Sequence, residues 1–287
     1  MESGSVVQQA DGMRTHLHRM WGSVAGAWAD HAEYADVRGA AMTERLIELT
    51  APAARERVLE LACGPGGVGL AVAQRVPAAE VVLSDVAPEM TAIAAARAAE
   101  LGLANVTTRE LDLERIDAPD GFHDIVLCRE GLMLVPDPEL AAREMARMLR
   151  PGGRLALAVW GPRERNPWLG IVFDSVSKQL GTPIPPPGIP GPFSLDDADR
   201  LREVLLGAGL ADLAVAELEV PYRAASAGEW WTRTLALAGP LAQMLAALPA
   251  DAAAALRARA IEAIGEYATP GGLEIPGVAL VASATRR

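Results

Sequence analysis

The sequence predicts an α/β fold in which a doubly wound sheet of seven strands is covered by helices. A short apolar run at residues 58–61 precedes a glycine-rich loop and a helix, which indicates a buried parallel strand. A second strand at 81–83 ends in an acidic residue. A helix at 138–149 then leads through a proline-glycine turn into a strand at 154–160. This alternation of strands and helices is typical of a sheet with parallel strands.

The remaining elements follow from apolar periodicity and turn residues. Pro88 suits the first turn of a helix, Asp137 and Pro138 suit the start of the next, and Ser194 is the expected cap of a third. An amphipathic segment at 166–180 precedes a proline-rich surface loop. The expected helices cover residues 11–29, 37–49, 70–75, 88–101, 138–149, 194–206, 227–248 and 251–267. The expected strands cover residues 58–61, 81–83, 105–113, 124–129, 154–160, 213–220 and 278–283.

Composition narrows the function classes. The 287 residues allow one large domain or a domain with an insertion, and hydrophobic residues make up 51% of them. No run approaches the roughly 18 apolar residues of a membrane span. A net charge of −11 argues against nucleic acid as a partner, because phosphate binding needs basic surface. Composition therefore disfavours nucleic acid as the substrate.

The two cysteines and the N-terminal residues indicate whether the chain binds a metal and in which cellular compartment it folds. Cys63 and Cys128 have no metal-ligand partner at useful spacing, so we expect no metal site. The first five residues show neither a basic start nor an apolar core, unlike a signal peptide. Two thiols without an export signal favour a reduced, cytoplasmic protein.

The glycine-rich loop is the strongest local signal. Gly64, Gly66 and Gly69 have the spacing of the dinucleotide-binding fingerprint, and Asp85 follows where that fingerprint requires an acid. Such a loop lets backbone N–H groups and a helix N-terminus approach a ligand. The pattern predicts a Rossmann-like nucleotide site without identifying the nucleotide.

Glu60 distinguishes two nucleotides. It lies four residues before Gly64, where its carboxylate would face the ligand. A carboxylate beside a pyrophosphate costs several kcal/mol in a partly dry site, whereas the ammonium and sulfonium of S-adenosylmethionine are cations. Glu60 therefore favours S-adenosylmethionine. A NAD(P)-dependent dehydrogenase is the alternative, against which Glu60 and the lack of a Tyr-x-x-x-Lys pair both argue.

Three stretches carry a family resemblance. Residues 58–67 resemble the first motif of class I S-adenosylmethionine-dependent methyltransferases, residues 81–90 their second, and residues 150–155 their turn before strand five. The resemblance is specific over about residues 40–160, and it is nearest to the ubiquinone/menaquinone-biosynthesis type (methyltransferase type 11). It implies methyl transfer from S-adenosylmethionine to a small molecule. A methyltransferase fold that keeps the cofactor as a scaffold for another reaction is a second alternative.

The resemblance also implies cofactor contacts. Asp85 would accept hydrogen bonds from both ribose hydroxyls. Asp112 would contact the adenine amino group, and Leu113 would supply a backbone contact. Met90 would pack on the adenine, although a core methionine fits equally well. The full expected set is Glu60, Ala62, Gly64, Gly66, Asp85, Val86, Met90, Asp112, Leu113 and Cys128.

Glu130 and His31 are the catalytic candidates. Glu130 follows the strand at 124–129, where related sequences usually carry an apolar or aromatic residue. An acid there could be a general base, could bind a cationic substrate, or could pair with Arg129. His31 ends the first expected helix, near where a lid would meet the pocket. His123 opens a buried strand, which favours a structural role.

The chain divides into three expected parts. Residues 1–52 form N-terminal helices, either a packing face or a lid over the cofactor. Residues 53–225 and 268–287 form the Rossmann-like core. Residues 226–267 form a helical insertion between strands six and seven that covers the acceptor pocket, or else a homodimer surface.

Tryptophans gather in the segments expected around the acceptor. Aromatic residues make up only 4% of the chain, and the substrate-binding candidates are Trp28, Trp160 and Trp168. Trp230 and Trp231 lie in the insertion. Their grouping predicts a largely apolar acceptor, although each tryptophan taken singly fits a core position. The pattern does not distinguish carbon, oxygen and nitrogen as the methylated atom.

Overall fold

A seven-stranded sheet forms the centre of the part of the chain that the computed structural model describes, residues 2–186 and 188–287. Its strand order is β3-β2-β1-β4-β5-β10-β6, and β10 runs antiparallel to both neighbours. The strands are β1 (Arg57–Leu61), β2 (Glu80–Asp85), β3 (Val106–Glu110), β4 (His123–Arg129), β5 (Leu149–Trp160), β6 (Leu210–Glu219) and β10 (Val278–Arg286). The predicted α/β class and doubly wound sheet are confirmed.

The order of the strands places a switch point between β1 and β4. The chain runs from β1 outward through β2 to β3, then returns to add β4 on the other side of β1. In open sheets of this kind, ligands bind at the carboxyl ends of the strands beside such a reversal. Glu60 pairs with Leu83 on one side and Leu127 on the other, so its side chain starts at this point.

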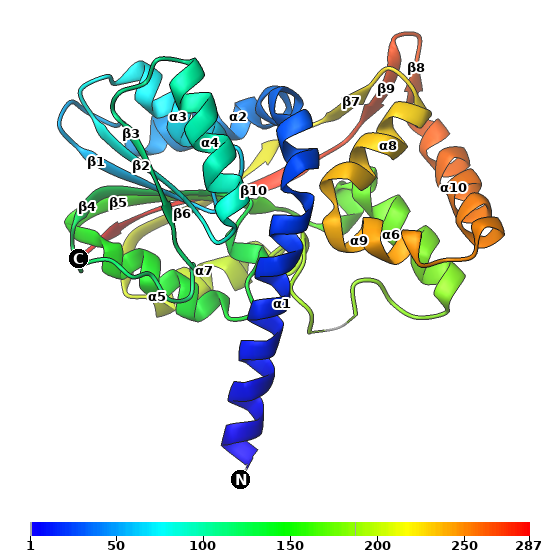
Figure 1. Cartoon of the computed structure of the whole chain (residues 1–287), viewed down its shortest axis with the longest axis horizontal. Helices are drawn as coiled ribbons and strands as arrows, with labels where there is room; N and C mark the ends of the chain where they lie inside the picture. Colours follow the sequence, from blue (N-terminus) through cyan, green and yellow to red (C-terminus); the bar gives the residue numbers. More distant parts are fainter. Residues whose placement is uncertain (1, 187) are drawn as a thin grey trace.

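Helices cover both faces of the sheet. On one face lie α2 (Ala32–Thr50), α3 (Gly67–Arg75) and α4 (Pro88–Glu100), and on the other lie α5 (Pro138–Met148) and α7 (Ala198–Gly207) (Figure 1). Because both faces are buried, the central residues of β1 and β4 are mainly apolar, Val58, Leu59 and Leu61 in β1 and residues 125–128 in β4.

Several helix ends follow from their sequence. The carboxylate of Asp137 accepts a 2.8 Å hydrogen bond from the Leu140 N–H, and Pro138 starts α5 as expected. The expected Ser194 cap is wrong. Asp197 caps α7, and the Ser194 hydroxyl accepts a hydrogen bond from Gly191 in the preceding turn. Both residues are good capping types, so the sequence alone favours neither.

A long helix, α1 (Glu2–Asp30), runs beside the core, and its N-terminal end projects from the body (Figure 1). It contacts α4 on one side and α8 and α9 on the other. α2 begins directly after His31, so the two N-terminal helices are longer than the stretches expected from periodicity.

The segment between β6 and β10 contains more than the two expected helices. Three helices are present in its described residues, α8 (Ala227–Leu237), α9 (Gly239–Ala246) and α10 (Ala250–Ile264). The break between α8 and α9 falls at Ala238, and the proline that follows in the first turn of α9 lacks the N–H that would continue α8. β7 (Tyr222–Ala224), β8 (Ala268–Thr269) and β9 (Gly272–Ile275) form a second, small sheet at the base of these helices.

The amphipathic segment after β5 is α6 (Pro167–Leu180), which packs against α10. Single 3-10 turns occur at η1 (Leu132–Leu134), η2 (Arg163–Arg165) and η3 (Gly265–Tyr267). The proline-rich loop follows α6, and its residue 187 lies outside the described residues. Among the described helices, none has the length and apolar character needed to cross a membrane.

Candidate functional site

The glycine loop connects β1 to α3 at the switch point. Gly66 has a φ of 89° and forms the N-cap of α3. Gly69 lies so close to β2 that an added Cβ would stand 2.1 Å from a Leu83 methyl carbon and 2.8 Å from a Glu60 carboxylate oxygen. Glycine is therefore required at 66 by backbone conformation and at 69 by close packing.

Glu60 is fully enclosed beneath this loop. Its side chain is 1% exposed, and its Oε2 accepts a 2.7 Å hydrogen bond from the Gly69 N–H. Burial raises the pKa of Glu60 to about 7, although hydrogen bonds from the α3 backbone and the charge of Arg129 act in the opposite direction. The carboxylate occupies the helix N-terminus at which a dinucleotide's pyrophosphate would bind.

Asp85 ties together the loops that follow β1 and β2. Its Oδ2 accepts a 2.9 Å hydrogen bond from the Gly64 N–H, and its Oδ1 accepts a 3.0 Å bond from the Ala87 N–H. Burial raises the pKa of Asp85, while these backbone donors lower it. Because each carboxylate oxygen has two lone pairs, Asp85 can still accept bonds from a ligand.

The segment after β3 brings two more acids to the same edge. Asp112 accepts a 2.8 Å hydrogen bond from the Glu114 N–H, and its Oδ2 lies 3.5 Å from Nε of Arg14 on α1. Glu114 is 2% exposed and accepts a 3.0 Å bond from the same Arg14 nitrogen. His18 of α1 lies 3.6 Å from Asp112. These contacts join α1 to the edge of the sheet.

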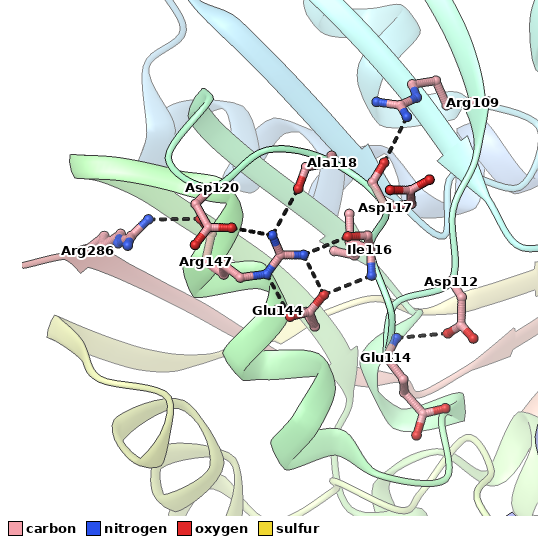
Figure 2. Close-up of polar contacts among 10 residues, drawn as sticks. All are labelled: Arg109, Asp112, Glu114, Ile116, Asp117, Ala118, Asp120, Glu144, Arg147 and Arg286. Carbon is pink, nitrogen blue, oxygen red and sulfur yellow. Dashed lines mark hydrogen bonds and ion pairs between the residues drawn. The ribbon is translucent and has the colours of Figure 1, made fainter. Parts of the chain in front are cut away.

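Arg147 fixes the segment that carries Asp112 (Figure 2). From α5 its guanidinium donates to the carbonyl oxygens of Ile116 and Ala118 at 2.6 and 2.9 Å. It also pairs with Glu144, whose other bond is to the Ile116 N–H at 2.8 Å. Hydrogen bonding to the carboxylates of Glu144 and Asp120 raises the pKa of Arg147. Because these hydrogen bonds fix the segment after β3, the carboxylates of Asp112 and Glu114 are held in one position.

A first cavity of about 120 Å³ lies among these acids. Most of the expected cofactor contacts border it, but Gly66 and Cys128 do not, and neither does His31. The His31 Nδ1 is buried and has no hydrogen-bond partner among the described residues. The expected residues that line this cavity are Glu60, Ala62, Gly64, Asp85, Val86, Met90, Asp112, Leu113, Glu130 and Trp28.

A second, larger cavity of about 310 Å³ lies beside the first. Trp160 and Trp168 line it, with ring centroids 5.0 Å apart, and Tyr222 stacks on Trp168 at 5.9 Å. Its other walls come from α1, α2, α8, α9 and the proline-rich loop. Trp230 is buried outside both linings, and its indole N–H donates to the Trp168 carbonyl at 2.9 Å, which anchors α8 to α6.

Five residues line both cavities, and they mark the place where the two meet: Leu17, Trp21, Trp28, Glu130 and Leu134. Glu130 follows the last residue of β4 and has a φ of 62°, a conformation that is uncommon for a residue with a side chain. Its N–H donates to the Ala158 carbonyl at 2.8 Å. Among the described residues it forms no ion pair with Arg129, whose Nη1 instead donates to the Thr43 hydroxyl at 2.7 Å.

Several residues at the site were not expected from sequence. Arg14, His18 and Trp21 reach the first cavity from α1, and Arg38 reaches the second from α2. Helical periodicity places these residues on helices but does not show which cavity a charged side chain borders. The crossing of α1 over the sheet edge brings Arg14, His18 and Trp21 to the first cavity, and the packing of α2 brings Arg38 to the second.

Comparison with known proteins agrees with this geometry. The family model described as a methyltransferase domain matches residues 58–153. Demethylmenaquinone methyltransferase of Thermus thermophilus is 38% identical over 45% of this chain and 58% of its own length. Nocamycin O-methyltransferase of Saccharothrix syringae is 30% identical over 65% of this chain and 70% of its own length. The chain belongs to the class I S-adenosylmethionine-dependent methyltransferase family.

Solved structures share the fold of this methyltransferase family member. The YcgJ protein of Bacillus subtilis superposes with a TM-score of 0.60 at 21% identity, over 85% of this chain and 97% of that one. The [4+2]-cyclase SpnF has a TM-score of 0.54 at 25% identity, over 85% of this chain and 80% of that one. The chain spans less than two thirds of the length of the Thermus relative, and the family model matches only residues 58–153, within the core.

The first cavity of this methyltransferase family member suits a cationic nucleotide. Five carboxylates border it, those of Glu60, Asp85, Asp112, Glu114 and Glu130, against the two guanidinium groups of Arg14 and Arg129. The buried N–H of Trp28 has no acceptor among the described residues. A site rich in acids with the helix N-terminus already occupied fits S-adenosylmethionine and opposes a pyrophosphate.

Proposed function

We propose that the protein transfers a methyl group from S-adenosylmethionine to a small, largely apolar acceptor. One observation carries this proposal. The acidic cavity and the apolar cavity meet where Glu130, just after β4, and Trp28 of α1 border both. Methyl transfer needs donor and nucleophile about 3 Å apart in a space without water, and adjoining cavities meet that need.

The donor would be held by residues of the core. Asp85 would accept bonds from the ribose hydroxyls, Glu60 would favour the cationic end, and Asp112 would accept from the adenine amino group. When bound, the donor supplies a methyl group on a cationic sulfur. The chain's part is to orient it and to exclude water, for which Trp21 and Trp28 of α1 are well placed.

We assign α1 the role of a lid over the donor cavity. It contributes Arg14, Leu17 and Trp21 to the lining, and Arg14 bonds to the buried Glu114. Glu130 is the candidate base, because it is half-buried at the junction and has no ion-pair partner among the described residues. We give the insertion helices α8 and α9 the role of covering the acceptor.

The acceptor is proposed to be a small molecule and not a nucleic acid, in keeping with the net charge of −11. The relatives include a named O-methyltransferase and a named C-methyltransferase, so both atoms are candidates. We propose a cytoplasmic location, since Cys63 and Cys128 are both buried and free.

Transfer of labelled methyl tests the proposal. The protein is incubated with S-adenosylmethionine labelled in the methyl group and with panels of small aromatic and aliphatic acceptors. Label in an acceptor, together with S-adenosylhomocysteine, supports methyl transfer. Cofactor that binds but is never consumed, with an acceptor converted to an unmethylated product, supports the scaffold alternative, which the likeness to a [4+2]-cyclase favours.

A further inference from the structure

Arg38 places a cation in the wall of the larger, mainly apolar cavity. It projects from α2, and the centre of its guanidinium lies 3.8 Å from the Trp168 ring, 4.7 Å from Trp160 and 4.8 Å from Tyr222. Those three rings come from β5, α6 and β7. Their convergence on one arginine holds the charge at a defined position in the cavity wall.

The chain leaves this cation without a counter-charge. The Arg38 Nε and Nη2 atoms are buried and have no hydrogen-bond partner among the residues that the structure describes. Over the same residues, no carboxylate forms an ion pair with the guanidinium within 4 Å, although Glu130 borders the same cavity. Ring faces attract a cation but accept no N–H bond along the guanidinium edge. Arg38 as a whole is half-buried, but leaving these two buried atoms without an acceptor is costly unless a ligand supplies one.

Arg233, a second arginine in the wall of the same cavity, differs from Arg38 in having a counter-charge. It also lines the wall and lies over an aromatic ring, 3.9 Å from the centroid of Tyr34. Its guanidinium is paired with Glu229, one helical turn earlier on α8. Arg233 is therefore neutralised by the chain itself, and Arg38 is not.

We propose that Arg38 recognises an anionic oxygen on the acceptor, so that the substrate of this site is an apolar molecule with one acidic group. This inference rests on the proposed function and narrows its substrate class. The acidic group would be a carboxylate or an ionised enol or phenol, since each presents an oxygen that accepts from a guanidinium. The apolar body would occupy the space between the rings and the proline-rich loop.

Matched pairs of acids and amides test the charge preference. The probes are octanoate, decanoate and cinnamate, each compared with its primary amide, which has nearly the same shape and no charge. Binding is measured by calorimetry on the full chain saturated with S-adenosylhomocysteine. At least one acid should bind about ten- to a hundredfold more tightly than its amide, as expected for a hydrogen bond to a charged group.

Variants assign the preference to Arg38. Arg38→Met keeps the length and apolar stem of the side chain and should bring acid and amide to equal affinity. Arg38→Lys keeps the charge and should retain part of the preference. Arg233→Met is the matched control in the same wall, and it should leave the preference of acid over amide in place because Glu229 already neutralises Arg233.

The outcomes separate this inference from the proposed function. Absence of any acid preference in the wild-type protein, or its full retention in Arg38→Met, overturns the role of Arg38. If Arg38→Met does not fold, the wild-type comparison and Arg38→Lys decide. Failure to bind S-adenosylhomocysteine would instead contradict the proposed function, whereas normal binding without an acid preference contradicts only the substrate class.

Discussion

Oε2 of Glu60, near the end of β1, accepts a 2.7 Å hydrogen bond from the N–H of Gly69 in the first turn of α3. A buried acid of the chain thus occupies the anion site that a glycine loop and helix N-terminus create. The same loop geometry that binds pyrophosphate in other nucleotide-binding folds is here already filled by a carboxylate. What remains for a ligand is a cavity in which acidic side chains outnumber basic ones, which suits a cation.

The pH dependence of stability should report the buried Glu60. Its pKa is raised to about 7 in the folded protein, against roughly 4.3 in the unfolded chain. Between these values the folded state keeps a proton that the unfolded state has released. The free energy of unfolding should therefore fall as pH rises from about 4 to 7, by on the order of 3 kcal/mol from this group.

Denaturant unfolding of wild type and Glu60→Gln across this range measures the effect. The variant has no carboxyl to titrate, so its stability should fall less steeply with pH than that of the wild type. Curves that run parallel for the two proteins would show that Glu60 ionises with its ordinary pKa.

Asp85→Asn should weaken donor binding. The substitution keeps the side-chain shape but removes the charge, and a hydrogen bond to a charged acceptor contributes ~1.5–3 kcal/mol. We expect the dissociation constant of S-adenosylhomocysteine to rise at least tenfold by calorimetry. Some loss of stability should accompany it, since Asp85 also holds the N–H groups of Gly64 and Ala87.

Asp124→Asn is the control for this prediction. Asp124 also accepts a backbone hydrogen bond, 2.8 Å from the Arg57 N–H, but at the opposite end of the sheet. The Asp124→Asn substitution should lower the free energy of unfolding without changing the affinity for S-adenosylhomocysteine. If the dissociation constant of S-adenosylhomocysteine is unchanged in Asp85→Asn, Asp85 does not bind the donor and only stabilises the loops after β1 and β2.

Glu130→Gln tests the general base. Removal of a base typically costs 10²–10⁴-fold in rate, so kcat should fall about a hundredfold while donor binding stays normal. Partial rescue at high pH is expected if the acceptor ionises unaided. The variant should fold, because no described residue forms an ion pair with Glu130. A loss of less than tenfold would mean that proximity alone drives transfer.

Leu237→Trp tests whether α8 covers the acceptor. Leu237 lines the larger cavity, and a bulkier side chain there should raise the acceptor KM or abolish turnover while donor affinity is unchanged. Thr232→Trp, on the exposed face of the same helix, is the matched control. If Leu237→Trp instead changes the oligomeric state in sedimentation and leaves turnover intact, the insertion is a dimer interface.

The core of the fold could be predicted because its signals are local. The glycine loop, the acid at Asp85, the Asp137-Pro138 start of α5 and the turn before β5 each depend on residues adjacent in sequence. Most of the expected cofactor residues line one cavity for the same reason, since they follow successive parallel strands that end at one edge.

The acceptor side could not be predicted to the same depth. The pairing of Tyr222 with Ile275 joins residues 53 positions apart, and three-residue strands carry little periodicity. Arg38 resembles any surface arginine of an amphipathic helix until Trp160, Trp168 and Tyr222 are seen around it. The sequence groups Trp230 with the tryptophans expected around the acceptor, but in the structure its indole N–H donates to the Trp168 carbonyl and fixes α8.

The identity of the nucleotide is the claim on which the other predictions depend, and calorimetry tests it directly. S-adenosylmethionine and S-adenosylhomocysteine should each bind the wild-type protein in the micromolar range, roughly −8 kcal/mol. NAD and NADP should give no measurable heat, because the Glu60 carboxylate occupies the helix N-terminus that their pyrophosphate requires. Tight binding of a nicotinamide dinucleotide, with neither sulfur nucleotide bound, would contradict the account.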